Sequence, residues 1–236
     1  MTADIYSRTS ALLGVDAVEK LKNARVAVFG AGGVGSAAIE ALARSGVGNI
    51  DIFDHDMISP SNLNRQLMTH SGNIGASKAE TAAERAKLIN PNADITAHEL
   101  FYLPETADTV DLSRFDYIID AVDTLTAKLE LVCRAVAAGI PIISCMGTGN
   151  KLDITRLRVS DIKKTEICPL ARRMRKELRN RGIDELRVVW SDEKPQSAEP
   201  TGEQKGDRPA PASAIFVPAA AGLLMAKEAI MALKHQ

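Results

Sequence analysis

Four glycines near the start of the chain have the spacing of a turn that binds phosphate. Gly30, Gly32 and Gly35 follow the pattern G-x-G-x-x-G, and Gly33 adds a fourth glycine. Glycine tolerates positive φ angles and lets backbone N–H groups come close to a phosphate. The helix expected at about 33–45 would add unpaired N–H donors and the positive end of its dipole. The pattern therefore predicts a nucleotide-phosphate site.

A carboxylate follows the next expected strand, residues 49–53. Asp54 lies 24 residues after Gly30, close to the ~20 residues at which dinucleotide-binding folds place a ribose-binding acid. Asp56, two residues later, is a second candidate for this contact. Taken alone, these features favour an NAD-dependent dehydrogenase.

The segments downstream carry polar groups that hydride transfer does not need. SNLNRQ occupies 61–66, Lys78 begins a helix expected to reach about residue 90, and Asp120 and Asp123 close a strand expected at 117–119. The carboxyl ends of strands in a doubly wound sheet converge on one crevice. Arginine and lysine can neutralise a polyphosphate there, and a carboxylate can hold Mg²⁺. Phosphoryl or nucleotidyl transfer fits this set better.

Strands alternate with helices along the first 150 residues. This order predicts an α/β, Rossmann-like fold with a doubly wound, mostly parallel sheet. The expected strands are 26–29, 50–53, 94–99, 117–119 and 140–145, and the expected helices are 11–21, 33–45, 78–89, a short one near 105–110, and 125–138.

The pattern changes after residue 149. We expect one or two antiparallel strands at 151–162, a helix ended by Gly182, a strand at 187–193, a mobile loop at 193–211 and a last helix at 217–233. These elements extend the sheet rather than form a second core. The expectation is one domain over 1–236, with a nucleotide-binding core (1–150) followed by a crossover segment, the loop and a C-terminal helix (151–236).

Composition limits the class of protein. The 236 residues are 45% hydrophobic and 25% charged with a net charge of −1, as in an ordinary soluble globular protein. Residues 163–187 are locally basic, with nine positive and four negative side chains. The three cysteines form no C-x-x-C pair, which argues against structural zinc and favours a reducing compartment. We expect a cytoplasmic protein with no stable membrane span, whose last helix could touch a membrane surface.

Four separated motifs occur in order: GAGGVGS, DHDMISPSNLNRQ, GASKAE and DAVDT. Together, over about residues 8–148, they resemble the adenylating domain of the E1-like superfamily, which includes the thiamin- and molybdopterin-pathway adenylyltransferases and the ubiquitin-activating enzymes. The tail, with KTEICPLARRMRKELRNRGI, RVVWSDEKP and SAIFVPAAAGLLMAKEAI, is similar to the tRNA threonylcarbamoyladenosine dehydratases. The resemblance implies ATP-dependent dehydration of N6-threonylcarbamoyladenosine at position 37 of tRNA, through a carboxyl-adenylate and with Mg²⁺.

The resemblance also implies roles for individual residues. Asp123 would hold Mg²⁺, although a helix N-cap is an alternative role for it. Arg65 and Lys78 would contact the triphosphate, and Arg8 would enter the neighbouring active site of a homodimer. The implied catalytic residues are Asp123, Arg65, Lys78 and Arg8; the implied nucleotide contacts are Gly30, Gly32, Gly33, Gly35, Asp54, Asp56, Asn62, Asn64, Arg65, Lys78, Asp123 and Thr124, with Asn62 and Asn64 either phosphate donors or turn formers.

Several alternatives stay open at this point. Activation of the C-terminus of a ubiquitin-like sulfur carrier shares the adenylation step, but relatives with that role often carry two C-x-x-C pairs. An NAD-binding oxidoreductase or a nucleotide-binding regulator leaves SNLNRQ and DAVD unexplained. Cys168 is either a thioester nucleophile or uninvolved, and a sulfur-transfer protein is a further candidate partner. The basic segment 163–187 either holds tRNA phosphates or is a solvated helix face.

Overall fold

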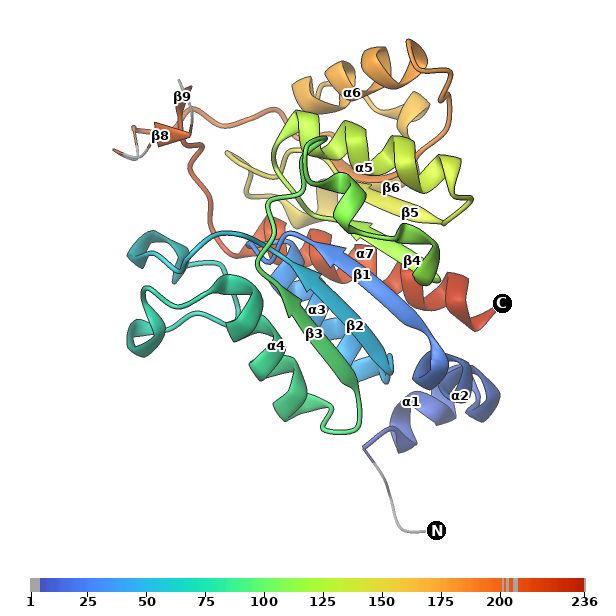
Figure 1. The fold of residues 1–236 in the computed structure, drawn as a ribbon. Helices are drawn as coiled ribbons and strands as arrows, with labels where there is room; N and C mark the ends of the chain where they lie inside the picture. Colours follow the sequence, from blue (N-terminus) through green and yellow to red (C-terminus); the bar gives the residue numbers. More distant parts are fainter. Residues whose placement is uncertain (1–4, 201, 203, 206–207, 236) are drawn as a thin grey trace.

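A seven-stranded sheet in the order β3-β2-β1-β4-β5-β7-β6 forms the centre of the computed structural model (Figure 1), which describes residues 5–200, 202, 204–205 and 208–235. Neighbouring strands run parallel except β6, which is antiparallel to β7. The expected α/β, doubly wound, mostly parallel fold is thereby confirmed. The strands are β1 (Arg25–Phe29), β2 (Asn49–Phe53), β3 (Asp94–His98), β4 (Tyr117–Asp120), β5 (Ile142–Cys145), β6 (Leu157–Asp161) and β7 (Arg187–Ser191).

The inner strands β1, β4, β5 and β7 are largely apolar on both sides, as is expected where helices cover both faces of a sheet. Val26 and Val28 of β1 point into one hydrophobic core, and Ala27 and Phe29 point into the other. The first core is covered by α2 (Val15–Asn23), α3 (Gly35–Ser45), α4 (Lys78–Ile89) and α7 (Phe216–Lys234), and the second by α5 (Leu125–Ala137) and α6 (Pro169–Arg179).

The strand register brings the candidate residues to one edge. Phe29 at the end of β1 pairs with Phe53 of β2 on one side and with Asp120 of β4 on the other. Gly30 follows Phe29 directly, Asp54 follows Phe53 directly, and Asp120 is the first residue of the DAVD motif. We call this side of the sheet the carboxyl edge.

Three helical boundaries differ from the sequence expectations. The helix expected at 11–21 is two helices, α1 (Ser7–Leu13) and α2, because Gly14 between them takes a φ of +100°. The basic helix α6 ends at Arg179 with Asn180 as its C-cap, so Gly182, at φ +75°, lies beyond the cap rather than next to it. The expected short helix near 105–110 is the 3₁₀ turn Ala107–Thr109.

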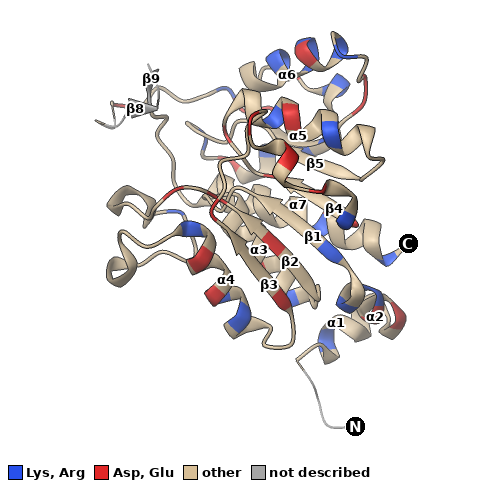
Figure 2. Ribbon diagram, in the orientation of Figure 1, with Lys and Arg blue, Asp and Glu red and all other residues tan. Residues whose placement is uncertain are grey.

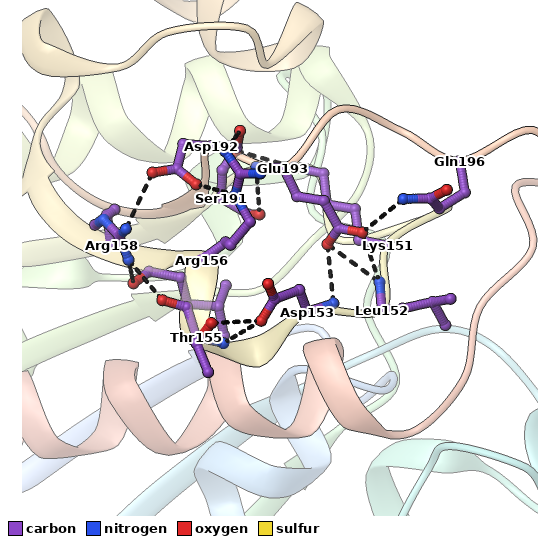
Figure 3. Close-up of polar contacts among 11 residues, drawn as sticks. Lys151, Leu152, Asp153, Thr155, Arg156, Arg158, Ser191, Asp192, Glu193 and Gln196 are labelled. Atoms are coloured by element: carbon purple, nitrogen blue, oxygen red, sulfur yellow. Dashed lines mark hydrogen bonds and ion pairs between the residues drawn. The ribbon is translucent and has the colours of Figure 1, made fainter.

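The long segment between β7 and α7 is hydrogen-bonded near both of its ends to the same residue, Asn150. The N–H of Gln196 donates to the Asn150 carbonyl (2.7 Å), and the Asn150 N–H donates to the Ala212 carbonyl (2.8 Å). The Glu193 carboxylate accepts from the N–H of Leu152 (3.1 Å) beside this point (Figure 3). Between these anchors lies the short hairpin of β8 (Gln204–Lys205) and β9 (Arg208–Pro209). The mobility of this loop stays a prediction.

Within the described residues, α7 is the one helix long and apolar enough to cross a membrane, but half of its most apolar stretch is buried inside the fold. A close approach to α3 positions it. A Cβ added to Gly222 would lie 2.1 Å from the Val34 carbonyl oxygen and 2.9 Å from the Ala37 Cβ. Its apolar composition is therefore that of a core helix.

The close approach of α7 to α3 predicts that Gly222→Val lowers the free energy of unfolding by about 3 kcal/mol, because the added carbons overpack against backbone. Urea denaturation measures this change. The matched control is Leu223→Val on the exposed side of the same helix, which we expect to change stability by about 0.5 kcal/mol or less. Equal stability of the two variants would show that the helices do not touch at Gly222.

Candidate functional site

The glycine turn between β1 and α3 is so tight that side chains cannot fit at two of its positions. Gly30 has a φ of +91°, and a Cβ added to it would lie 2.7 Å from the Ala121 carbonyl oxygen. A Cβ on Gly35 would lie 1.7 Å from the Gly30 carbonyl oxygen. Glycine at these positions therefore lets the turn pack against the end of β4, which carries the DAVD motif.

Backbone donors at the start of α3 are available to a ligand. The N–H groups of Gly32, Gly33 and Val34 have no acceptor within the part of the chain that the structure describes. They precede the first turn of α3, where the helix dipole adds positive charge. A phosphate chain is the ligand that matches such a set.

Asp54 holds the same turn from the β2 side. Its Oδ2 accepts from the Ala31 N–H (2.6 Å) and its Oδ1 from the Asp56 N–H (2.9 Å). Burial raises the pKa of the Asp54 carboxyl, and these two backbone donors act in the opposite direction. Asp54 thus fixes the shape of the glycine turn, whatever contact it also makes with a ribose.

Lys78 is a buried cation at the first residue of α4. Its side chain is 8% exposed, and its Nζ donates to the Asp56 carboxylate (2.7 Å). The Lys78 N–H also donates to the Asp56 carbonyl (3.0 Å), and Ser77 caps the helix. Since Asp56 lies two residues beyond Asp54, Lys78 is held at the carboxyl edge on the β2 side of the glycine turn.

Arg65 lies across the glycine turn. Its Cγ is 3.3 Å from the position of a Cβ on Gly33. Its Nη1 donates to the Ser61 carbonyl (2.7 Å) and to Asn64 Oδ1 (3.0 Å). These bonds use one terminal nitrogen of the guanidinium, so they orient Arg65 beside the free amides.

The two asparagines of SNLNRQ shape the loop that carries Arg65. The Asn62 side chain is buried, and its Oδ1 accepts from the Ser59 N–H (3.0 Å) within a 3₁₀ turn at Pro60–Asn62. The Asn64 Nδ2 donates to the Ser213 carbonyl (2.9 Å) just before α7. Of the two roles that the sequence allows for these side chains, phosphate donor and turn former, both make contacts of the second kind in the structure.

Sequence reasoning missed a buried ionic network beneath the DAVD turn. Lys128 on α5 is fully buried, and its Nζ donates to Asp120 Oδ2 (3.0 Å) and to Ser144 Oγ (3.2 Å). Ser144 Oγ donates to the same Asp120 oxygen (2.5 Å), and Asp120 Oδ1 accepts from the Val122 N–H (3.2 Å). A lysine between apolar residues on the inner face of α5 is the signal that could have revealed it.

Asp123 and Thr124 follow this network at the carboxyl edge. Asp123 is exposed, and the N-cap residue of α5 is Thr124, so the alternative role of Asp123 as the N-cap is wrong. The DAVD turn packs on Gly30 from the β4 side, opposite Lys78. The sheet therefore places a cation and a carboxylate on the two sides of one phosphate cradle.

Carboxylate donors for a cation are also present on the β2 side. One ligand atom from each of Asp54, His55 and Asp56 lies within 4.8 Å of the others. The His55 ring stacks on Phe101 with centroids 3.9 Å apart. Carboxylate oxygens at both sides of the cradle are the donors that Mg²⁺ prefers, so the residue types fit this ion.

Two candidate residues lie outside this constellation. Arg8 is exposed on α1, next to the C-terminal end of α3, where Tyr6 packs 3.1 Å from a Cβ on Gly46. Since α3 begins at the glycine turn and has 11 residues, about 16 Å of helix separate Arg8 from its own cradle. Cys168 is buried at the N-terminus of α6, which packs beside α5 rather than beside the glycine turn.

Comparisons with known proteins find similarity along nearly the whole chain. The model of the ThiF family matches residues 6–236. The tRNA threonylcarbamoyladenosine dehydratase of Bacillus subtilis is 40% identical, over 97% of this chain and 94% of its own length. Crystal structures of the Escherichia coli tRNA N6-threonylcarbamoyladenosine dehydratase, TcdA, superpose with a TM-score of 0.89 for the AMP complex (30% identity, 100% of this chain, 97% of that one) and 0.86 for the ATP complex (31%, 98% and 93%).

The buried network predicts that Lys128→Met costs about 3–5 kcal/mol of unfolding free energy, because it leaves the Asp120 carboxylate buried without its cation. Chemical denaturation gives the value. The double variant Asp120→Asn with Lys128→Met removes both charges and should recover part of this stability. Wild-type stability of the single variant would contradict the network.

Proposed function

The chain belongs to the ThiF family, and from this premise we propose that it is an ATP-dependent tRNA threonylcarbamoyladenosine dehydratase. The observation that carries the proposal is the 40% identity to the Bacillus subtilis dehydratase along nearly the full length of both chains. The cradle of free amides flanked by Lys78 and Arg65 supports it, since the reaction begins on a triphosphate. Three cysteines without disulfides fit a reducing compartment, so we place the enzyme in the cytoplasm.

The first step converts the carboxylate oxygen, which is a poor leaving group, into part of AMP, which is a good one. A carboxylate oxygen of the threonylcarbamoyl group attacks the α-phosphorus of ATP, the bond to the β-phosphate oxygen breaks, and pyrophosphate leaves. Negative charge moves onto the pyrophosphate as that bond breaks. Lys78, Arg65 and the amides before α3 are placed to stabilise this charge.

The second step closes a ring within the modified base. An internal nucleophile of the same threonylcarbamoyladenosine attacks the acyl carbon, the bond to AMP breaks, and a proton is lost. The carboxylate oxygen leaves on AMP, so the tRNA loses the elements of one water. No protein nucleophile is needed, which matches the burial of Cys168. The protein orients the groups and keeps water from the adenylate.

Asp123 is the residue that we propose to hold Mg²⁺ on the β4 side of the cradle. The ion would neutralise charge on the phosphates of bound ATP. Asp54 and Asp56 offer further oxygens on the β2 side of the cradle. Asp123 is exposed at the end of the DAVD turn, where an ion on the phosphates could reach its carboxylate, and this position favours it as the ligand.

We propose further that the enzyme acts as a homodimer with shared sites. Arg8 lies about the length of α3 from its own glycine turn, so it can serve as a phosphate contact only for another copy. Leu12 near the end of α1 and Val15 at the start of α2 have exposed apolar side chains, which suit burial in such a contact.

Incubation of the protein with ATP, Mg²⁺ and tRNA that carries threonylcarbamoyladenosine should remove one water from the modified base. Mass spectrometry of the digested tRNA measures this change. Asp123→Ala should lower the rate at least about a hundredfold, as removal of a residue that stabilises charge in the transition state does. No mass change with wild-type protein, combined with pyrophosphate exchange that needs a small carrier protein, would replace this function with carrier activation.

Shared sites predict complementation between two inactive variants. Arg8→Ala and Asp123→Ala are each expected to be inactive as homodimers, but a co-expressed mixture should regain about a quarter of wild-type activity, because half of the dimers are mixed and each has one intact site. Size-exclusion chromatography checks that dimers form. Absence of any regained activity in mixed dimers would place Arg8 outside the site.

A further inference from the structure

Helix α6 has two faces of opposite character. Ala171, Met174 and Leu178 are buried in the core on the α5 side of the sheet. The opposite side of the helix exposes the cations Arg172, Arg173, Lys176 and Arg179, and Figure 2 shows the basic residues along this helix. We call these four residues the α6 basic face.

Ion pairs with acidic side chains do not neutralise the α6 basic face. None of its four residues forms an ion pair within the described part of the chain. Glu177, the one acidic residue of α6, is paired instead with Arg181 (2.8 Å). Elsewhere ion pairs neutralise most of the surface arginines: Arg25, Arg44, Arg85, Arg134, Arg156, Arg158, Arg181 and Arg187.

The helix is held firmly in place. Arg175 points inward, where its Nη1 donates to the carbonyls of Thr165 (2.5 Å) and Ile162 (3.3 Å) and to the Thr165 hydroxyl. The 3₁₀ turn Ile162–Lys164 is itself capped by Asp161. A rigid element that carries several unpaired cations costs little ordering entropy when it binds an anion.

The position of α6 relates this face to the nucleotide site. Cys168, which caps α6, has its Sγ 3.8 Å from a Cβ on Gly147, two residues beyond the end of β5. The helix therefore begins at the carboxyl edge, and it packs beside α5, which begins directly after Thr124. From Arg172 to Arg179 the basic face extends about 10 Å away from that edge, a distance that covers several phosphates of a nucleic acid.

From these observations we infer that the α6 basic face is the surface that binds the phosphate backbone of the tRNA substrate. The inference rests on the proposed function, which requires a large polyanion to present one base at the carboxyl edge. A net charge of −1 for the whole chain supplies no general attraction, so a local basic surface has to supply it. These contacts position the tRNA without reading its sequence.

The test is a variant with Arg172, Arg173, Lys176 and Arg179 all changed to Gln. Its matched control changes four exposed cations elsewhere, Lys87, Arg114, Lys194 and Lys227, to Gln and has the same net charge. Steady-state dehydration kinetics are measured against tRNA and against ATP over a range of salt concentrations. Circular dichroism and thermal unfolding verify that both variants fold.

For the basic-face variant we expect the KM for tRNA to rise about tenfold or more. Its salt dependence should weaken by ~0.7–0.9 in log–log slope for each phosphate contact that the substitutions remove. The KM for ATP and kcat at saturating tRNA should change less than about twofold, because phosphate contacts to tRNA affect binding rather than the chemical step. The control variant should behave like the wild type.

A basic-face variant with the tRNA KM and salt dependence of the control overturns the inference, while the proposed function stands because the wild type still dehydrates tRNA. Sedimentation with vesicles of phosphatidylglycerol and phosphatidylcholine that depends on the basic face, without an effect on the tRNA KM, would assign this face to membrane lipids instead. Absence of dehydration in the wild type itself would refute the function, not only the surface.

Discussion

The site depends on a contact between two stretches of backbone that side chains would prevent. Gly30 meets the Ala121 carbonyl, and Gly35 meets the Gly30 carbonyl, at distances that leave no room for a Cβ. This packing joins the ends of β1 and β4, and Asp54 joins β2 to them through the Ala31 N–H. Because the turn is fixed from both sides, the free amides before α3 point to a constant position, which electrostatic stabilisation of a leaving group requires.

Charged side chains lie buried beneath the site as well as within it. The network of Lys128, Asp120 and Ser144 is fully buried. It holds the DAVD turn in place because Asp120 also accepts a hydrogen bond from the Val122 N–H. A buried ion pair contributes little net stability, but removal of one partner is costly. The network therefore tolerates little variation, and it holds Asp123 at the edge where the phosphates of ATP are expected.

Much of this arrangement could be predicted from the sequence. The alternation of apolar strands with amphipathic helices predicts the doubly wound sheet, and four motifs in order identify the family. Hydrophobic periodicity does not reveal that a single glycine separates two helices. It therefore predicts one helix where the structure has α1 and α2 on either side of Gly14. The role of Lys128 could not be predicted because a lysine is ordinarily a surface residue. Its partners Asp120 and Ser144 also lie on two different strands, β4 and β5. The separation of Arg8 from its own cradle is a property of three-dimensional packing, and no local pattern encodes it.

The central claim is that the substrate carboxylate itself attacks the α-phosphorus of ATP. The most direct measurement places a heavy-oxygen label in the carboxylate of threonylcarbamoyladenosine on tRNA and follows it by mass spectrometry after one turnover. The account predicts that the label appears in AMP, with pyrophosphate as the other product. Label in inorganic phosphate together with ADP, or unlabelled AMP beside dehydrated tRNA, would contradict it.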